Sequence, residues 1–320
     1  METILGYSSK KPKMGDPLKE LSGINSVIDL IGNTPLIKLN GFPELEPTKE
    51  LYVKAEWFNP GGSIKDRAAL SMIIDGINSK KLNSKKIIMD SSSGNTAIAY
   101  AMIGAALGFK VELVTPENIN VERKKTLQAY GAKIIYSSPL EGSDGAIIEA
   151  RKLAKKFPDK YFMPDQYNNP ANPLAHFQTT GPEIWEQTKG AITHLICGIG
   201  TGGTAMGTGE YLKTKNPNIK VVGVQPDDSL HGLEGLKHIP TSIKPGIYNE
   251  ELIDELFWAN TEKSYEIMEK LVNLEGMFVG HSGGAVVLAA LKELSKIDNG
   301  VIVCIVPDGG YRYLSGGVWW

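Results

Sequence analysis

Short apolar runs rich in β-branched residues alternate along the chain with longer segments in which apolar residues recur every three or four positions. The first pattern is typical of buried strands, and the second of helices that bury one face or more. The predicted strands are 86–90, 111–115, 133–136, 193–197, 220–224 and 301–306. The predicted helices are 97–107, 121–130, 144–156, 204–213, 264–272 and 285–296.

This alternation indicates an α/β fold. Strands separated by helices need crossover connections, so the sheets should be mostly parallel, with helices on both faces. A chain of 320 residues is long enough for two domains, each with its own core. Residues 157–174 contain four prolines and three asparagines, which disfavour regular structure. We therefore predict that this segment passes from one domain to the other.

Composition and charge argue against several classes of function. Thirty-four basic and 36 acidic residues give a formal net charge of -2, so no long-range field would attract nucleic acid or an anionic membrane. The longest near-apolar run, 97–109, is too short to span a bilayer, and the N-terminus lacks a signal-peptide pattern. A cytoplasmic protein is expected. Cys197 and Cys304 end apolar runs and should be buried; a disulfide is the weaker alternative.

Four Gly- or Ser-rich turns each precede a predicted helix, and they are the candidates for chemistry. Backbone N–H groups at the start of a helix can bind an anion, and glycine lets the ligand approach closely. The turns read NPGGSIKDR at 59–67, SSSGNT at 91–96, GIGTGGT at 198–204 and GHSGGA at 280–285. Anion sites for a cofactor or a substrate are therefore predicted at several helix starts.

The first turn delivers Lys65 into the first turn of a helix. A cation at this place opposes the helix dipole, and desolvation would further lower the pKa of the amine. An amine with a lowered pKa can form a Schiff base with a carbonyl compound. Taken alone, the turn fits a solvated surface lysine better, because most lysines are solvated.

The other three turns differ in what they could bind. The hydroxyls of 91–96 favour a carboxylate pocket over a simple helix cap. The third turn is typical of phosphate binding and loosely resembles a dinucleotide fingerprint. However, Val224 is followed by Gln225, where a nicotinamide-binding protein would end the next strand with an acidic residue. The fourth turn, taken alone, predicts only a tight helix start.

In this order and spacing, the four turns resemble the fold-type-II pyridoxal-phosphate family of cysteine synthases and cystathionine β-synthases. The likeness extends from 31–36 to 313–315, and the segments 168–173, 179–185 and 226–248 look most like cysteine synthase B. The resemblance implies two three-layer αβα domains with mostly parallel twisted sheets. The implied parts are an N-terminal arm (1–30), strands that pack on the large domain (31–58), a small substrate-loop domain (59–160) and a large cofactor-phosphate domain (161–320).

Residue roles follow from the resemblance. Lys65 is implied to carry pyridoxal 5′-phosphate and to remove the substrate Cα proton. Asn95 should contact the 3′-oxygen of the cofactor ring, and Ser282 its nitrogen. The residues implied to hold the cofactor phosphate are Gly200, Thr201, Gly202, Gly203 and Thr204. Those implied to bind the substrate carboxylate are Ser92, Ser93, Thr96 and Gln166. No metal site is implied.

The implied reaction is that of a transferase acting on a serine-derived amino acid. O-acetylserine and sulfide would give L-cysteine and acetate through an aminoacrylate intermediate, and a homodimer is the family habit. A cysteine β-lyase that releases hydrogen sulfide, and a cystathionine β-synthase, would use the same motifs. A nicotinamide dehydrogenase or a non-catalytic binding protein is the alternative from another class, but it leaves Lys65 and Asn95 without a purpose.

Two local features bear on substrate choice and packing. Asp227 and Asp228 would repel the phosphate of O-phosphoserine if they face the site, which favours a donor with a neutral leaving group. Lys237 and His238 could offset this repulsion, and a solvated turn is an equally good interpretation of the two aspartates. His281 stands beside Ser282 where relatives often have isoleucine, so it is expected to pack rather than to catalyse.

Overall fold

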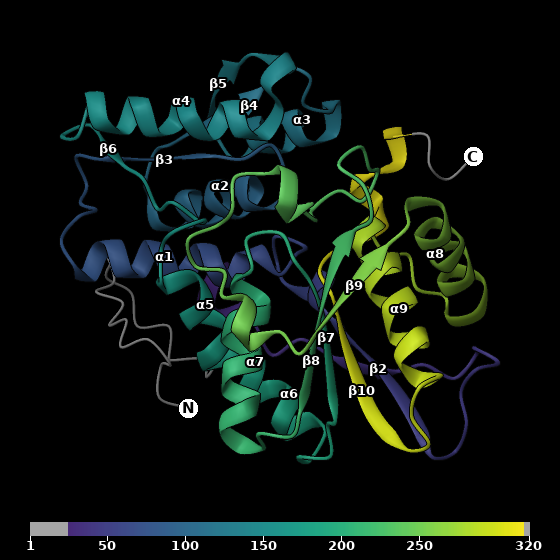
Figure 1. Ribbon diagram of the computed structural model, residues 1–320. Coiled ribbons are helices and arrows are strands. Elements are labelled where there is room, and N and C mark those ends of the chain that lie inside the picture. Colours follow the sequence, from purple (N-terminus) through teal and green to yellow (C-terminus); the bar gives the residue numbers. More distant parts are fainter. Residues whose placement is uncertain (1–24, 317–320) are drawn as a thin grey trace.

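The structure is a computed structural model that describes residues 25–316. Its strands form two sheets, one of six strands in the order β1-β2-β10-β7-β8-β9 and one of four in the order β5-β4-β3-β6 (Figure 1). The first contains β1 (Leu36–Lys38), β2 (Lys49–Ala55), β7 (His194–Gly198), β8 (Lys220–Pro226), β9 (Glu255–Ala259) and β10 (Gly300–Val306). The second contains β3 (Ile87–Ser91), β4 (Val111–Pro116), β5 (Lys133–Ser137) and β6 (Tyr161–Phe162).

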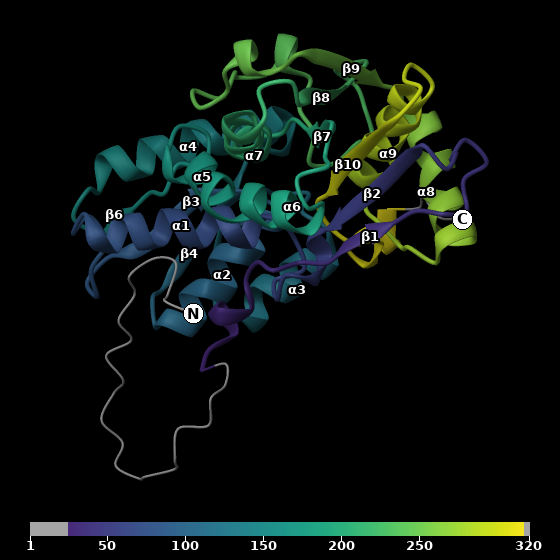
Figure 2. The same ribbon diagram turned by 90° about the horizontal axis from the view of Figure 1, so that it is seen from below.

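The six-stranded sheet lies between two layers of helices (Figure 2). Apolar residues of α8 (Thr261–Glu275) and α9 (His281–Leu294) pack on one face, and those of α6 (Gly181–Gln187) and α7 (Gly203–Lys215) on the other. The pair β1 and β2 is antiparallel, and the other neighbouring strands pair in parallel. Parallel strands covered on both faces read as continuous apolar runs, which explains why β7, β8 and β10 were predictable.

The four-stranded sheet is parallel throughout and is also covered on both faces. On one side lie α1 (Lys65–Asn78), α2 (Asn95–Leu107) and α3 (Val121–Ala129), and on the other lies α4 (Gly142–Lys156) (Figure 1). The two sandwiches confirm the predicted α/β fold with two three-layer units. The predicted strands and helices all appear, with ends displaced by four residues or fewer.

Several elements were not predicted. The strands β1, β2 and β9 carry polar residues among the apolar ones and lack a clear run, and β6 has only two residues. Residues 157–174, predicted as a passage between domains, include β6 and the start of α5 (Ala171–Ala175), which continues into a π-helical turn at His176–Thr180. The predicted domain limits remain predictions; β6, directly after residue 160, pairs with β3. Residues 1–24 of the predicted arm lie outside the described residues.

The two sheets present the ends of their strands to each other, and this arrangement creates the site. β3 ends at the Ser-rich turn and β7 ends at the Gly-rich turn, and each turn leads into a helix, α2 or α7. Crevices at the carboxyl ends of parallel strands are where α/β proteins bind ligands. Cys197 and Cys304 are buried in the core, as predicted, and are free thiols. No helix within residues 25–316 is long and apolar enough to cross a membrane.

Candidate active site

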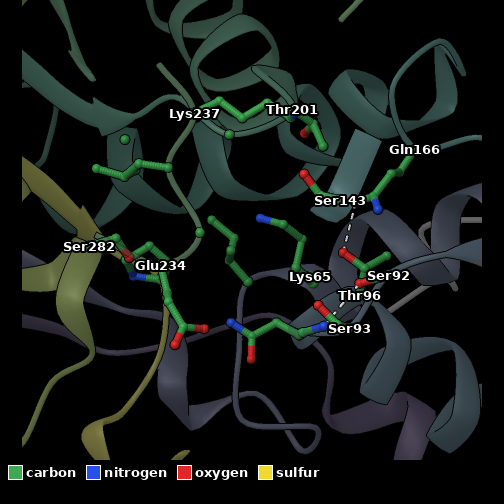
Figure 3. Close-up of a pocket in the computed structure, with 18 of the residues that line it drawn as sticks. Lys65, Ser92, Ser93, Thr96, Ser143, Gln166, Thr201, Glu234, Lys237 and Ser282 are labelled. Atoms are coloured by element: carbon green, nitrogen blue, oxygen red, sulfur yellow. Dashed lines mark hydrogen bonds between the residues drawn. The ribbon is translucent and has the colours of Figure 1, made fainter. Parts of the chain in front are cut away.

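A cavity of about 260 Å³ lies where the turns of both units meet (Figure 3). Eleven of the twelve residues assigned to the site from the sequence line it. They are Lys65, Ser92, Ser93, Asn95, Thr96, Gln166, Gly200, Thr201, Gly202, Thr204 and Ser282. The twelfth, Gly203, lies beneath the cavity wall, where an added Cβ would stand 2.0 Å from the side-chain oxygen of Asn172. The turns are therefore brought together as one pocket.

Lys65 projects its amine into the middle of this cavity (Figure 3). It is the first residue of α1, and Ile64 before it donates its backbone N–H to the carbonyl of Pro307 at 2.9 Å. Burial lowers the pKa of Lys65, and the charges of Asp308 and Glu56 oppose this shift. Lys65 thus lies inside a cavity and not on the open surface, and its desolvation agrees with the expectation from the sequence; its role in binding the cofactor stays a prediction.

A buried ion cluster holds the first turn of α1 in place. The guanidinium of Arg67 donates to both carboxylate oxygens of Glu56, at 2.8 and 2.9 Å, and to both oxygens of Glu183, at 2.6 and 2.8 Å. The ammonium of Lys54, which is fully buried, contacts Glu183 at 2.7 Å. Since Arg67 is two residues from Lys65, the cluster fixes the lysine relative to β2 and α6.

The Ser-rich turn forms a second wall. The Thr96 hydroxyl donates to the Gln166 side-chain oxygen at 2.8 Å, and the Gln166 amide donates to the carbonyl of Ser91 at 3.2 Å (Figure 3). The Ser92 hydroxyl accepts from the N–H groups of Gly94 and Ala97. Hydroxyls and backbone amides at the start of α2 thus point toward one edge of the cavity, and this donor set suits a carboxylate.

The Gly-rich turn admits no larger residue at its centre. A Cβ on Gly200 would lie 2.4 Å from the carbonyl oxygen of Gly235, and Gly202 has a φ of +87°. The Thr201 hydroxyl accepts from the Asn172 amide at 3.2 Å. The bare backbone therefore comes close to the cavity just before the 13-residue helix α7, as an anion site requires.

Ser282 and His281 are neighbours with different surroundings. Ser282 lines the cavity from the first turn of α9. The ring of His281 packs between Tyr265 and Tyr313, with centroids 5.3 and 4.3 Å away, and burial lowers the pKa of His281. The prediction that His281 packs is confirmed.

Asn95 belongs to a polar network that the sequence analysis missed. Its amide nitrogen donates to Asp308 at 2.7 Å, and its oxygen accepts from Arg312 at 2.5 Å. The Tyr313 hydroxyl also donates to Asp308. Asp308 lies in the PDGG turn that follows β10, and Arg312 and Tyr313 come shortly after that turn; its glycine pair was the feature that could have drawn attention to them. One N–H of the Asn95 amide remains available to a ligand.

Ion pairs between the two units stand at the mouth of the cavity. Arg123 of α3 donates to Glu234 at 2.6 Å, and Lys237 donates to Asp144 at the start of α4, at 3.1 Å. Among the described residues that line the cavity, Glu234 is the one carboxylate. Arg123 and Glu234 could not be recognised as a pair from the sequence, because nothing in the local pattern links residues 111 positions apart.

Asp227 and Asp228 do not line the cavity. Asp227 accepts from the amide of Asn260 at 3.0 Å, and Asp228 accepts from the backbone N–H of Leu230 at 2.8 Å. The solvated turn is thus the correct interpretation, and their assignment to donor selection is wrong. His238 is also held outside, with its ring 2.8 Å from the Thr241 hydroxyl.

Comparison with known proteins agrees with this geometry. Residues 27–308 match the family model described as pyridoxal-phosphate dependent enzyme. A cysteine synthase of Aquifex aeolicus is 52% identical over 296 residues, which cover 91% of this chain and 90% of the relative. This chain belongs to the pyridoxal-phosphate dependent enzymes, in the cysteine synthase family.

Two further members extend the comparison. Cysteine synthase B of Pseudomonas aeruginosa is 41% identical over 294 residues, covering 92% of this chain and 97% of the relative. The crystal structure of a cysteine synthase from Entamoeba histolytica superposes with a TM-score of 0.88 at 35% identity, covering 97% and 94% of the two chains. The fold-type-II architecture implied by the resemblance is therefore confirmed.

The residues of the cavity fit the cofactor of this family. Pyridoxal phosphate presents an aldehyde, a phenolic oxygen, a ring nitrogen and a phosphate. The cavity offers a desolvated amine on Lys65, an amide donor on Asn95, a hydroxyl on Ser282 and a bare backbone turn at 200–204. Each group of the cofactor thus has a partner of suitable chemistry.

Proposed function

We propose that this protein is a cysteine synthase that replaces the acetate of O-acetylserine by sulfide. The observation that carries the proposal is the convergence of three features in one cavity: the buried amine of Lys65, the donor-rich turn 91–96 and the glycine turn 198–204. An amine of lowered pKa beside separate sites for a phosphate and a carboxylate suits an amino-acid enzyme of this cofactor class.

Four sets of groups would hold the cofactor. Lys65 would bind its aldehyde carbon through Nζ, Asn95 its 3′-oxygen and Ser282 its ring nitrogen. The backbone of Gly200–Thr204 and the hydroxyls of Thr201 and Thr204 would bind its phosphate. When bound, the cofactor withdraws electrons from the Cα of the amino acid. A neutral hydroxyl at the ring nitrogen keeps this withdrawal moderate, which favours β-replacement over transamination.

The chain's own groups would orient the substrate and move its proton. Ser92, Ser93, Thr96 and the helix start at α2 would bind the substrate carboxylate, and the Thr96 hydroxyl would turn its proton to the carboxylate from the Gln166 oxygen, 2.8 Å away. The Nζ of Lys65 would take up the Cα proton, and its lowered pKa keeps a larger share of the amine unprotonated near neutral pH.

The direct test is the formation of L-cysteine from O-acetylserine and sulfide by the purified holoenzyme. We expect sulfide-dependent cysteine formation with a kcat/KM well above that for sulfide release from cysteine. A faster release of sulfide from cysteine alone would favour the β-lyase alternative. Faster use of homocysteine than of sulfide would favour a cystathionine β-synthase.

Replacing Ser282 with aspartate should retain the cofactor and slow β-replacement by at least about tenfold. A carboxylate would hold a proton on the ring nitrogen, strengthen electron withdrawal and open transamination as a side reaction. Cofactor content, cysteine formation and pyridoxamine phosphate formation measure the three effects. Ser282→Ala, which removes the hydroxyl without adding charge, is the control. An unchanged kcat in the aspartate variant would refute the role of Ser282.

Gly200→Ala should weaken cofactor binding by at least about tenfold, because its methyl group would lie 2.4 Å from the Gly235 carbonyl and push the turn aside. Gly94→Ala is the matched control: its Cβ meets nothing within 4 Å among residues 25–316, and it lies on the opposite wall. The dissociation constant comes from titrating the apoenzyme with pyridoxal phosphate by absorbance. Equal effects of the two substitutions would contradict the assignment of the phosphate site.

We also propose that the enzyme acts in the cytoplasm as a homodimer. Cys197 and Cys304 are free thiols, which is the usual state of cysteines in a reducing compartment. Dimer formation rests on the habit of the family. Sedimentation velocity on the holoenzyme tests it, and a monomer at micromolar concentration would exclude it.

A further inference from the structure

The mouth of the cavity holds a cation that is partly masked by a carboxylate. Arg123 comes from α3, and Glu234 comes from the connection that follows β8; their contact is 2.6 Å. The Arg123 side chain is 10% exposed, whereas that of Glu234 is 48% exposed. Glu234 lines the cavity, and Figure 3 shows it on the side where Ser282 lies, across from Ser92 and Thr96. The cation is therefore buried and its partner is accessible.

Arg123 retains donors that nothing in the described residues uses. Its guanidinium stacks over the ring of Tyr313 at 5.2 Å from the centroid, and its buried Nε has no hydrogen-bond partner there. A guanidinium carries five N–H donors in a planar fork that binds phosphate or carboxylate through two bonds. Glu234 engages Nη2, so it stands where an anionic ligand would approach the fork.

The position of this pair decides which part of a substrate it meets. The substrate carboxylate is assigned to the turn 91–96, and the amino group to the neighbourhood of Lys65. The wall left for the β-substituent is the one lined by Arg123, Glu234 and Lys237. Lys237 stacks on Tyr167, and its ammonium donates to Asp144 at 3.1 Å and keeps two further N–H donors, so the test has to separate it from Arg123.

We propose that Glu234 is a specificity-determining residue, which masks Arg123 and so selects donors with an uncharged β-substituent over donors with an anionic one. This inference rests on the proposed function, because it concerns the donor of that reaction. An anionic leaving group would have to displace Glu234 from the guanidinium and would meet a like charge at the mouth. An acetyl ester has an uncharged β-substituent, so it needs neither the N–H donors of Arg123 nor the space that the Glu234 carboxylate occupies.

The test measures binding without turnover. The holoenzyme is titrated by calorimetry with two unreactive amino acids, L-2-amino-3-phosphonopropionate, which carries a phosphonate on Cβ, and L-2-aminobutyrate, which carries a methyl group there. In Glu234→Gln, which keeps the size of the side chain, the ratio of the two dissociation constants should shift at least tenfold toward the phosphonate. The ratio of kcat/KM for O-phosphoserine over O-acetylserine should rise in parallel.

Two matched variants separate Arg123 from other causes. Arg123→Gln in the Glu234→Gln background should abolish the gain for the phosphonate, because the unmasked cation is then gone. Asp144→Asn, which breaks the second ion pair at the mouth, should shift the ratio less than threefold. Cofactor content and melting temperature confirm that each variant is folded.

Several results would overturn the proposal. These are an unchanged ratio in Glu234→Gln, an equal tightening of both ligands, a gain that survives the loss of Arg123, and a shift in Asp144→Asn as large as that in Glu234→Gln. The last result would make Lys237 the selecting cation. Failure of the sulfide-dependent assay would instead refute the proposed function. The ratio of the two dissociation constants is measured without turnover, so it does not depend on that assay.

Discussion

Replacing Lys65 with alanine should abolish cysteine formation, with kcat lowered by about 10⁴-fold or more. The variant loses the amine that would bind the cofactor and also the base for the Cα proton, and a positioned general base alone accounts for about 10²–10⁴-fold. Cysteine formation at saturating O-acetylserine and sulfide measures the effect. The expectation rests on the place of Lys65 in the middle of the cavity and on the burial that lowers its pKa.

A covalent-labelling experiment shows whether Lys65 itself binds the cofactor. The holoenzyme is treated with borohydride, denatured and freed of small molecules, and the cofactor that remains on the protein is measured by mass spectrometry. Lys237 is the matched control, because it is the second lysine among the described residues that line the cavity. The wild type and Lys237→Ala should retain the label, and Lys65→Ala should lose it. Retention by Lys65→Ala would place the covalent bond elsewhere.

The sequence predicted most of the fold because the central strands are apolar throughout. β7, β8 and β10 are covered on both faces, so a run of β-branched residues identifies each of them. β2 was missed because its buried face carries Lys54, a residue that usually marks the surface. Its burial is possible only because Glu183, 129 residues away, lies 2.7 Å from its ammonium. The pattern of residues around Lys54 gives no information about a partner so far away in the sequence.

In the site, as in the fold, local features could be predicted from the sequence and contacts between distant residues could not. The turns that hold glycines and hydroxyls could be recognised in the sequence. Glycine permits the backbone conformation of such turns, and hydroxyls bind the free N–H groups at helix starts. The sequence analysis expected a carboxylate near the substrate from the connection after β8, at Asp227 and Asp228, but the carboxylate of this connection that lines the cavity is Glu234. Gly235, with a φ of +93°, turns the backbone next to Glu234. Which carboxylate of a long connection faces inward depends on this conformation, and the sequence does not reveal it.

Arg67→Met should lower the free energy of unfolding by about 3–5 kcal/mol, the usual cost of removing one partner from a buried ion pair. Glu56, whose side chain is fully buried, would lose its guanidinium partner, and Glu183 would keep the ammonium of Lys54 and the backbone N–H of Asn33. Urea unfolding of the holoenzyme measures the loss. Arg151→Met is the matched control, because Arg151 pairs with Asp165 at 3.6 Å with a side chain that is 39% exposed. Exposed pairs contribute about 0–1 kcal/mol, so its loss should be small.

The pH dependence of stability distinguishes the ion cluster from a packing effect. Burial alone would raise the pKa of Glu183, but the hydrogen bonds and charges of Arg67 and Lys54 outweigh it and hold the pKa at about 2. Because the folded pKa is lower than the ordinary value of 4.5, the stabilisation is complete above that value and is lost as the pH falls toward 2. A shift of this size corresponds to about 3 kcal/mol.

In Arg67→Met, the acid-dependent loss of stability between these two pH values should therefore shrink, while the variant is already less stable at neutral pH. If the unfolding free energies of wild type and variant fall in parallel with acid, the guanidinium does not set the charge state of Glu183. Loss of stability by packing alone would give that parallel result. Because Arg67 lies two residues from Lys65, a variant that unfolds no more easily than Arg151→Met would also mean that the ion cluster does not fix the position of the lysine.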